Sequence, residues 1–189
     1  MRKLLIAGIG LAMIAAVPGA AQVGNDTAAL AAQKAALDKF AWMDGTWRGP
    51  AVTKFPSGEH RVTQTERIGP MLGGTVRVVE GRGFNADGSI GFNAFAVISY
   101  DAAKQAYDFR SYAQGRMGDF MIRPTADGYV WEIPAGPMTI RYTATLKDKV
   151  WTEIGERIAP GQAPVKFFEM HLTRVGDSDW PNGGAMTPK

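Results

Sequence analysis

Apolar and polar residues alternate with a period of two from Gly45 onward, in segments of about six to ten residues. Turn-forming groups, such as Pro56-Ser57-Gly58 and Asn85-Ala86-Asp87-Gly88, separate these segments. No stretch between them is long enough for a crossover helix, so the strands are expected to be antiparallel. The pattern predicts about ten strands, at residues 46–55, 60–68, 75–84, 90–100, 106–113, 117–123, 129–134, 138–146, 150–158 and 165–175.

A meander of this many strands either closes on itself or leaves two edges exposed. Closure satisfies the N–H and C=O groups of those edges. The expected fold is therefore all-β, an antiparallel up-and-down β-barrel of about ten strands over residues 40–175. A chain of 189 residues with 46% hydrophobic residues is long enough for one such domain with a sizeable core.

The segments on either side of the barrel have different patterns. Residues 1–21 combine Arg2 and Lys3 with an apolar run and small residues, which is typical of a cleaved signal peptide. The apolar run is too short and too interrupted for a membrane anchor. Residues 22–39 are rich in alanine and other helix formers and predict a short N-terminal helix, whereas residues 176–189 predict an irregular tail.

Charge and cysteine content narrow the partners and the compartment. The net charge falls from +3 to +1 when Arg2 and Lys3 are removed with the signal peptide, which argues against a nucleic-acid or anionic-membrane partner. The chain has no cysteine, which excludes disulfides, thiolate metal sites, a cysteine nucleophile and a lipid-bearing cysteine. We expect a soluble protein of the periplasm or the secreted space, without a stable membrane anchor. The oligomeric state is left open.

Strand alternation assigns one face of each strand to the barrel interior. In the 60–68 strand, Arg61 and Arg67 mark the solvent face. The next strand is expected to place Arg77 outward, and the last strand is expected to place His171 outward. The residues expected inside include Val62, Gln64, Glu66, Ile68, Val76, Val78, Glu80, Met138, Ile140, Tyr142, Ala144, Phe168, Met170, Leu172 and Arg174. A mostly apolar and aromatic lining with few polar groups is typical of a small-molecule pocket.

Glu66 and Glu80 are the acidic exceptions in this lining. As neighbours in an interior of low polarity, at least one of them is expected to have a raised pKa. They could orient the polar head group of a ligand, act as acid and base, or each pair with an inward Arg or Tyr in a buried network. At one end of the barrel, we expect Arg174 of the last strand to stack on Trp47 of the first and to clamp the closure.

Sequence motifs indicate no established chemistry. No P-loop, HExxH or GxSxG pattern occurs. The two histidines, His60 and His171, are too few for most zinc sites, but one imidazole suffices as an axial haem ligand. We assign no catalytic residue and expect no metal and no cofactor, with haem at His171 as an alternative. The residues expected to contact a ligand are Trp47, Gln64, Glu66, Glu80, Tyr100, Trp131, Tyr142 and Met170.

Several short strings together carry a family resemblance. They are Phe40-Ala41-Trp42-Met43-Asp44-Gly45-Thr46-Trp47-Arg48-Gly49, Thr65-Glu66-Arg67-Ile68, Met71-Leu72-Gly73-Gly74-Thr75, Glu80-Gly81-Arg82-Gly83, Ile98-Ser99-Tyr100-Asp101 and Phe168-Glu169-Met170-His171-Leu172-Thr173-Arg174-Val175. In this order they resemble the DUF1579-type bacterial family of uncharacterised lipocalin-like proteins. The resemblance implies a calycin-like barrel and brings no settled biochemical role. The Gly-Thr-Trp-Arg-Gly opening is more distantly similar to nitrobindin-like haem barrels, which need an inward axial histidine.

The expected function is that of an exported barrel protein that holds a small, mainly apolar or amphipathic molecule in its interior. Three alternatives remain at this point. The protein could bind haem or nitric oxide through His171, or act as an enzyme that uses Glu66 and Glu80. It could also be a structural or interaction module with a filled core.

Overall fold

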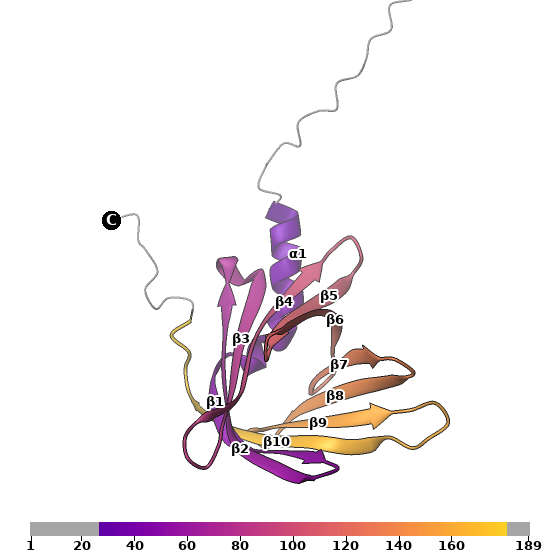
Figure 1. Ribbon diagram of the computed structural model, residues 1–189. Coiled ribbons are helices and arrows are strands. Elements are labelled where there is room, and N and C mark those ends of the chain that lie inside the picture. Colours follow the sequence, from indigo (N-terminus) through magenta and orange to yellow (C-terminus); the bar gives the residue numbers. More distant parts are fainter. Residues whose placement is uncertain (1–26, 181–189) are drawn as a thin grey trace, which may run out of the picture.

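The computed structural model describes residues 27–180, so the predicted signal peptide lies outside the described residues. Ten antiparallel strands form one closed barrel in the order β1-β10-β9-β8-β7-β6-β5-β4-β3-β2 (Figure 1). Their bounds are β1 Gly45–Phe55, β2 Gly58–Met71, β3 Val76–Phe84, β4 Ile90–Asp101, β5 Ala106–Ala113, β6 Arg116–Pro124, β7 Gly128–Ala135, β8 Met138–Lys147, β9 Val150–Ile158 and β10 Val165–Gly176. The prediction of an antiparallel up-and-down barrel is confirmed.

The barrel closes where the first strand pairs with the last. Trp47 of β1 is the Cα partner of Arg174 of β10, and the register shifts between Thr46 and Trp47. Gly49 lies in this seam, where a Cβ atom would overlap the carbonyl group of His171. Only glycine lets the two backbones approach this closely. The weakest junction is between β6 and β7, which share three residue pairs and diverge in Figure 1.

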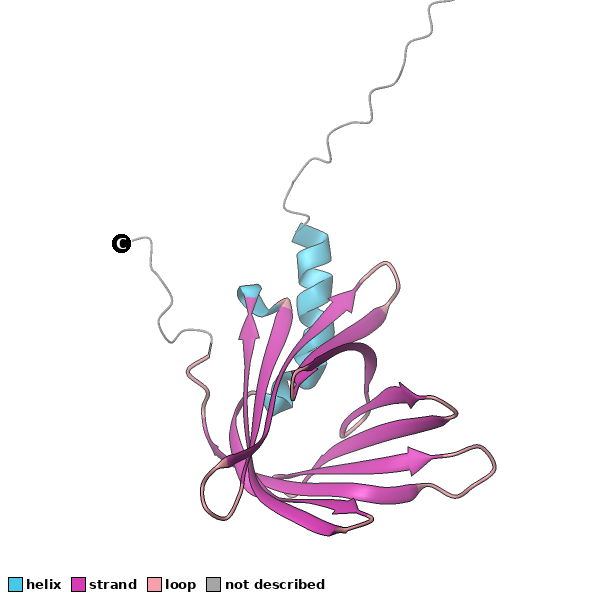
Figure 2. Cartoon of the chain, in the orientation of Figure 1, coloured by secondary structure: helices cyan, strands magenta, loops and turns pink. Residues whose placement is uncertain are grey.

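A helical segment covers one end of the barrel. The α-helix α1 (Thr27–Leu37) continues into a 3-10 helix, η1 (Asp38–Met43), and lies against β3 and β4 (Figure 2). Leu37 and Phe40 are completely buried, and the Tyr107 hydroxyl donates a hydrogen bond to the Ala36 carbonyl at 3.2 Å. The predicted N-terminal helix is therefore present, and it plugs the barrel through its last turn.

Arg77 fastens this plug to the barrel wall. Its guanidinium donates to both carboxylate oxygens of Asp44, at 2.8 and 2.9 Å, and also to the carbonyl of Leu37. Arg77 is only 3% exposed, so this bidentate pair lies within the plugged end. The strand alternation predicts Arg77 on the solvent face, and that prediction was wrong.

The error in β3 has a local cause. Between β2 and β3 the chain turns through a second 3-10 segment, η2 (Leu72–Gly74), in which all three residues have positive φ. This turn sets the β2–β3 register so that Glu66 faces Gly81, and Arg67 faces Glu80. A shift of one residue exchanges the two faces of a strand. Because Val78 and Val79 are adjacent, the apolar pattern of β3 fits either assignment.

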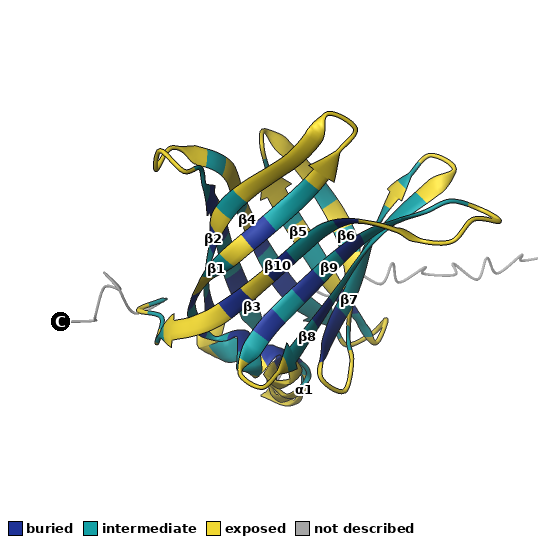
Figure 3. Cartoon of the chain, turned by 90° about the horizontal axis from the view of Figure 1, so that it is seen from below, coloured by how far each residue is buried: buried dark blue, intermediate teal, exposed yellow. Residues whose placement is uncertain are grey.

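Burial is graded along the barrel axis. The largest completely enclosed side chains gather near the helix, whereas the hairpin turns at the other end are exposed (Figure 3). These enclosed side chains are Trp151, Phe40, Leu37, Ile68, Ile98, Ile122 and Leu172. The barrel therefore has a packed end, under α1 and η1, and an open end, formed by the five hairpins β1–β2, β3–β4, β5–β6, β7–β8 and β9–β10.

The start of the C-terminal tail is irregular but lies on the outer wall. The Arg67 guanidinium lies 4.0 Å above the Trp180 ring and also pairs with Asp179 at 3.3 Å. The Trp180 ring contacts Phe95 edge-on, with ring centroids 6.1 Å apart. Residues 177–180 thus cover part of the β2–β4 surface.

Candidate functional site

The barrel interior holds most of the residues that the sequence analysis proposed for ligand contact. Directly paired residues of antiparallel neighbours share a face, so one row runs from Trp47 through Glu66 and Gly81 to Ala94. By the same reasoning seven of the eight proposed residues point inward, namely Trp47, Gln64, Glu66, Tyr100, Trp131, Tyr142 and Met170.

Glu80 is the exception, and its inward placement was wrong. It lies on the outer wall between two arginines, with carboxylate oxygens 3.4 Å from Arg67 Nε and 2.5 Å from Arg82 Nη2. Its carboxyl group is thus part of a surface ion-pair network. It does not form the interior pair with Glu66 that we expected.

The floor of the interior is an aromatic cluster at the packed end. Trp47 is 3% exposed, its ring meets Trp151 edge-on at 5.6 Å, and its Nε1–H donates to the Met43 carbonyl at 2.8 Å. Trp42 of η1 stacks on Tyr129 with ring centroids 6.0 Å apart. Trp47 therefore acts as a packed floor residue with its polar atom already satisfied.

The expected stack of Arg174 on Trp47 does not form, although the two residues are Cα partners. The Arg174 side chain is 44% exposed, and its guanidinium reaches past Gly45 to the Asp44 carbonyl at 3.3 Å and to Asp177 at 2.5 Å. Arg174 thus fastens the chain just before β1 to the end of β10. The physical reason is that Asp177 and the Asp44 carbonyl hold the guanidinium away from the indole, whose own N–H is bound to Met43.

Two carboxyl groups lie inside the barrel just above the floor. Glu66 accepts a hydrogen bond from Gln64 Nε2 at 2.7 Å, and Glu153 of β9, which is 8% exposed, accepts one from the Tyr129 hydroxyl. Gly81 makes room for the first carboxyl, because a Cβ atom there would lie 2.8 Å from Glu66 Oε1. The interior acid pair is therefore Glu66 with Glu153.

The environment raises the pKa of both groups. Burial is the main cause for Glu66, whose pKa rises to about 8; the charges of Glu153 and Glu80 add to this, and the Gln64 hydrogen bond opposes it. Burial also raises the pKa of Glu153 to about 7, against the effect of its hydrogen bond from Tyr129. Near neutral pH the pair retains protons, so it can both donate and accept hydrogen bonds.

Sequence reasoning predicted an acid pair with a raised pKa but chose the wrong second member. Glu153 alternates with Trp151 and Gly155 on one face of β9, a pattern that favours an inward position. The alternation in β9 would therefore have sufficed to predict that Glu153 points inward. What the sequence does not show is that Glu153 comes close enough to Glu66 for its charge to raise the Glu66 pKa, since β9 and β2 are not neighbouring strands.

An aromatic wall lines the interior on the side of the open end. Trp131 and Tyr142 stack with ring centroids 4.5 Å apart, and Phe109 and Phe120 contact Trp131 at 5.0 and 5.5 Å. Tyr142 also meets Phe168 at 5.9 Å. Burial, followed by the charge of Glu153, raises the pKa of Tyr142 to about 12, although the Arg157 charge opposes this. The Tyr142 hydroxyl is therefore a hydrogen-bond donor at neutral pH.

The aromatic wall remains accessible, and small residues lie elsewhere on the inner face. Trp131, Tyr142, Phe109, Phe120 and Phe168 point inward yet all are partly exposed, in contrast to the enclosed floor. Residues on the inner face of β3–β5 include Gly81, Gly83, Ala94, Ala96 and Ser111. Large flat rings thus line one part of the inner face, and small residues line another.

Both histidines are exposed; His171 lies on the outer face of β10, as predicted, and His60 lies at the open end of β2. His171 contacts Thr152 Oγ1 at 3.1 Å and Glu169 Oε1 at 3.0 Å, and His60 contacts Asn85 at 3.0 Å. A haem ligated by His171 would therefore lie outside the barrel. Within residues 27–180, no group of three or more His, Cys, Asp or Glu side chains is placed to hold a metal ion.

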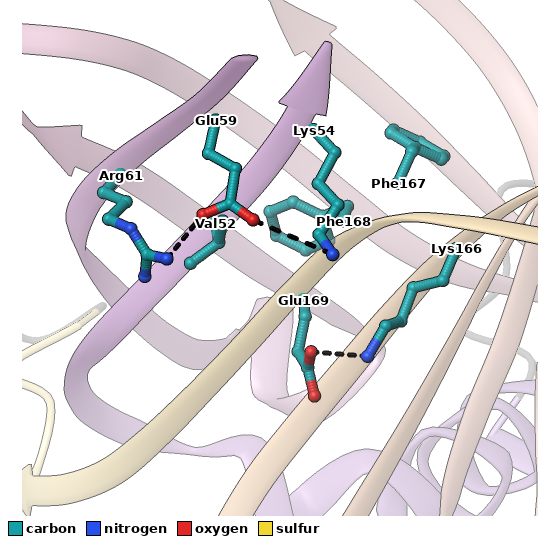
Figure 4. A pocket seen from close by; sticks show the side chains of 8 residues that line it. All are labelled: Val52, Lys54, Glu59, Arg61, Lys166, Phe167, Phe168 and Glu169. Atoms are coloured by element: carbon teal, nitrogen blue, oxygen red, sulfur yellow. Dashed lines mark hydrogen bonds and ion pairs between the residues drawn. The ribbon is translucent and has the colours of Figure 1, made fainter. Parts of the chain in front are cut away.

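Two shallow hollows lie at the open end. One, of about 230 Å³, is bordered by the ion pairs Lys54–Glu59–Arg61 and Lys166–Glu169, beside Phe167 and Phe168 (Figure 4). The other, of about 380 Å³, lies at the β5–β6 turn and is lined by residues 93–95 and 112–117.

The helix α1 in the described part of the chain is not long and apolar enough to cross a membrane.

The fold and the interior chemistry define a closed ten-stranded antiparallel barrel with a packed floor, an interior acid pair and an accessible aromatic wall. Comparison with known protein families found no match, and neither did comparison with curated proteins. The resemblance to the DUF1579-type family and to nitrobindin-like barrels therefore stays a prediction.

Solved structures do match this fold. One is the crystal structure of Rv2717c from M. tuberculosis, which superimposes with a TM-score of 0.55 at 13% sequence identity. The match covers 74% of this chain and 96% of the mycobacterial chain. At this low identity, the likeness shows the shared barrel fold alone.

Proposed function

We propose that the protein is an exported carrier or sensor that binds a small, mainly apolar molecule in the open half of its barrel. The observation that supports this proposal is a difference in burial between the two ends of the barrel interior. Most inward side chains near the helix, such as Trp47, Ile98 and Leu172, are buried. The inward rings of Trp131, Tyr142 and Phe168, nearer the open end, stay partly exposed. Apolar rings that face inward without being covered are the usual lining of a ligand site. The composition of residues 1–21 supports export.

The polar groups of the interior favour a particular orientation of the ligand. The ligand body lies against the Trp131–Tyr142 stack, and its polar end points toward Gln64, Glu66 and Glu153. An anionic head group is disfavoured, because its charge would be poorly solvated there and would be repelled whenever either carboxyl group loses its proton. The expected ligand therefore carries a neutral or cationic polar group.

A fluorescence titration with the neutral apolar probe N-phenyl-1-naphthylamine tests the proposal. The decisive variant is Ser111→Trp, because residue 111 points into the barrel and the added ring would fill the accessible half. Ser99→Trp is the matched control, since residue 99 lies on the outer face of the neighbouring strand. We expect the probe to bind the unaltered protein and Ser99→Trp, and to bind folded Ser111→Trp at least about tenfold more weakly.

Equal probe binding by both tryptophan variants, with unchanged circular dichroism, would show that the probe does not enter the barrel. Native mass spectrometry of protein purified from its own host supplies a second readout. A co-purified small molecule that is lost in Ser111→Trp supports an interior site. Repeated absence of any bound mass, together with no probe binding, would favour the filled-core alternative.

A further inference from the structure

Exposed apolar side chains surround the mouth of the barrel. Each of the five hairpins at the open end carries one at or next to a strand terminus. These residues, which we call the apolar rim, are Phe55, Ile90, Met117, Met138 and Val165, with exposures of 50%, 52%, 59%, 38% and 57%. Figure 3 shows the hairpin turns at this end as exposed, as are the turns near α1. Their number and placement are unusual, because monomeric proteins rarely gather exposed apolar residues around one opening.

Within residues 27–180, the turns of the packed end do not each carry an exposed apolar residue. These turns consist largely of polar and small residues, at 102–105, 125–127 and 148–149. Leu72 in η2 is 76% exposed, and Met71, Leu30 of α1 and Val175 near the end of β10 are exposed apolar residues at this end as well, but they do not lie one to a turn. The clustering is therefore a property of the open end, and Leu72 provides a natural control for exposed apolar surface in general.

Cationic residues accompany the rim. The hairpin segments 54–59, 85–90, 114–117, 135–138 and 157–166 contain four cationic residues, Lys54, Arg116, Arg157 and Lys166, and two anionic ones, Glu59 and Asp87. Lys54 and Lys166 pair with neighbouring glutamates, whereas Arg116 forms no ion pair within residues 27–180. The net charge of the chain is near neutral, but the hairpin segments at the open end carry an excess of positive charge.

We propose that the open end docks on the surface of a lipid bilayer that contains anionic lipids, with the apolar rim inserted among the head groups. The five rim residues lie at the same end of the barrel, and apolar residues flanked by cations are the composition of interfacial membrane contacts. Charge decides against a second copy of this chain, because rim-to-rim contact would bring two positively charged ends together. Docking would also place the mouth of the interior next to the acyl chains.

The test is co-sedimentation of the full chain with vesicles of phosphatidylcholine alone and of phosphatidylcholine mixed with phosphatidylglycerol. The variant Phe55→Ser/Met117→Ser/Val165→Ser removes three rim side chains, and Leu72→Ser is the matched control. Residues 1–26 are the same in all variants, so any vesicle affinity of that segment cancels in the comparison. We expect the rim variant to partition at least about tenfold more weakly than the control. Arg116→Glu should weaken binding mainly to the vesicles that contain phosphatidylglycerol.

A local probe checks the orientation. In Phe55→Trp, the added tryptophan fluorescence should shift to the blue on vesicle addition, whereas in Leu72→Trp it should not. Equal partitioning of the rim variant and Leu72→Ser, or an equal shift at both positions, would overturn the proposal. So would a rim-dependent dimer in light scattering without vesicle binding, because it would assign the rim to a second copy.

Docking on a membrane does not require the ligand site. The purpose of docking, however, rests on the proposed ligand-binding function. Naphthylamine binding measured on the same variants separates the two. Vesicle docking without probe binding would leave the membrane inference intact and remove the ligand proposal. Probe binding that is unchanged in a rim variant that no longer docks would support both.

Discussion

The acid pair predicts that the folded protein becomes less stable as the pH rises. Burial raises the pKa of the Glu66 carboxyl from 4.5 to about 8 in the folded protein, so the folded state keeps a proton that the unfolded state has already released. The folded state binds more protons between these two values, and stability therefore falls as pH rises through this window. The stabilising contribution comes from the protonated Glu66 carboxyl. It is present in full only below the pKa that this group has in the unfolded protein.

The magnitude follows from the size of the shift. One proton changes the free energy of unfolding by about 1.4 kcal/mol per pH unit, so Glu66 alone accounts for a loss of about 3 to 4 kcal/mol between about pH 5 and pH 8. Water that reaches this partly exposed carboxyl will reduce the figure. The raised pKa of Glu153, about 7, adds a loss of the same sign.

Urea unfolding followed by tryptophan fluorescence at several pH values measures this slope. Glu66→Gln keeps the size of the side chain and removes its titration, so this variant should lose about half of the slope and become more stable than the unaltered protein near pH 8. Glu80→Gln is the control, because Glu80 lies on the outer wall and is the last of the causes that raise the Glu66 pKa. A slope that is the same in Glu66→Gln as in the unaltered protein would refute the placement of Glu66 in a desolvated interior.

Three further substitutions test the plug, the acid pocket and the tail. Arg77→Met leaves Asp44 without its partner in the plugged end and should cost about 3 to 5 kcal/mol, seen as a lower midpoint in thermal unfolding. Gly81→Ala places a Cβ atom 2.8 Å from Glu66 Oε1 and should cost about 1 to 3 kcal/mol in urea unfolding; an unchanged midpoint would contradict the packing described here. Trp180→Ala removes the partner of the Arg67 guanidinium and should cost only about 0.5 to 1 kcal/mol, while increasing amide exchange in residues 177–180.

Much of this protein follows from local pattern. The alternation of apolar and polar residues predicts the number of strands and their limits, because a half-buried strand needs a period of two. The turn residues between them predict the antiparallel order, because short connections cannot cross over. The inward positions of Gln64, Glu66 and Tyr142 follow from the same alternation, and so does the outward position of His171.

Tertiary structure decided what local pattern leaves open. The conformation of Leu72–Gly74 set the β2–β3 register, and this register moved Glu80 to the outer wall and brought Arg77 into the plugged end. Either assignment satisfies the alternation of β3, because adjacent valines occupy both faces.

Closure of the barrel determined which distant residues became neighbours. It brought Glu153 near Glu66 across the interior, although β9 and β2 do not pair. It also gathered five separate hairpin tips into one apolar rim. Sequence determines which face and which end of a strand a residue occupies. The neighbours that it meets across the interior depend on how ten strands close, because closure brings together residues far apart along the chain.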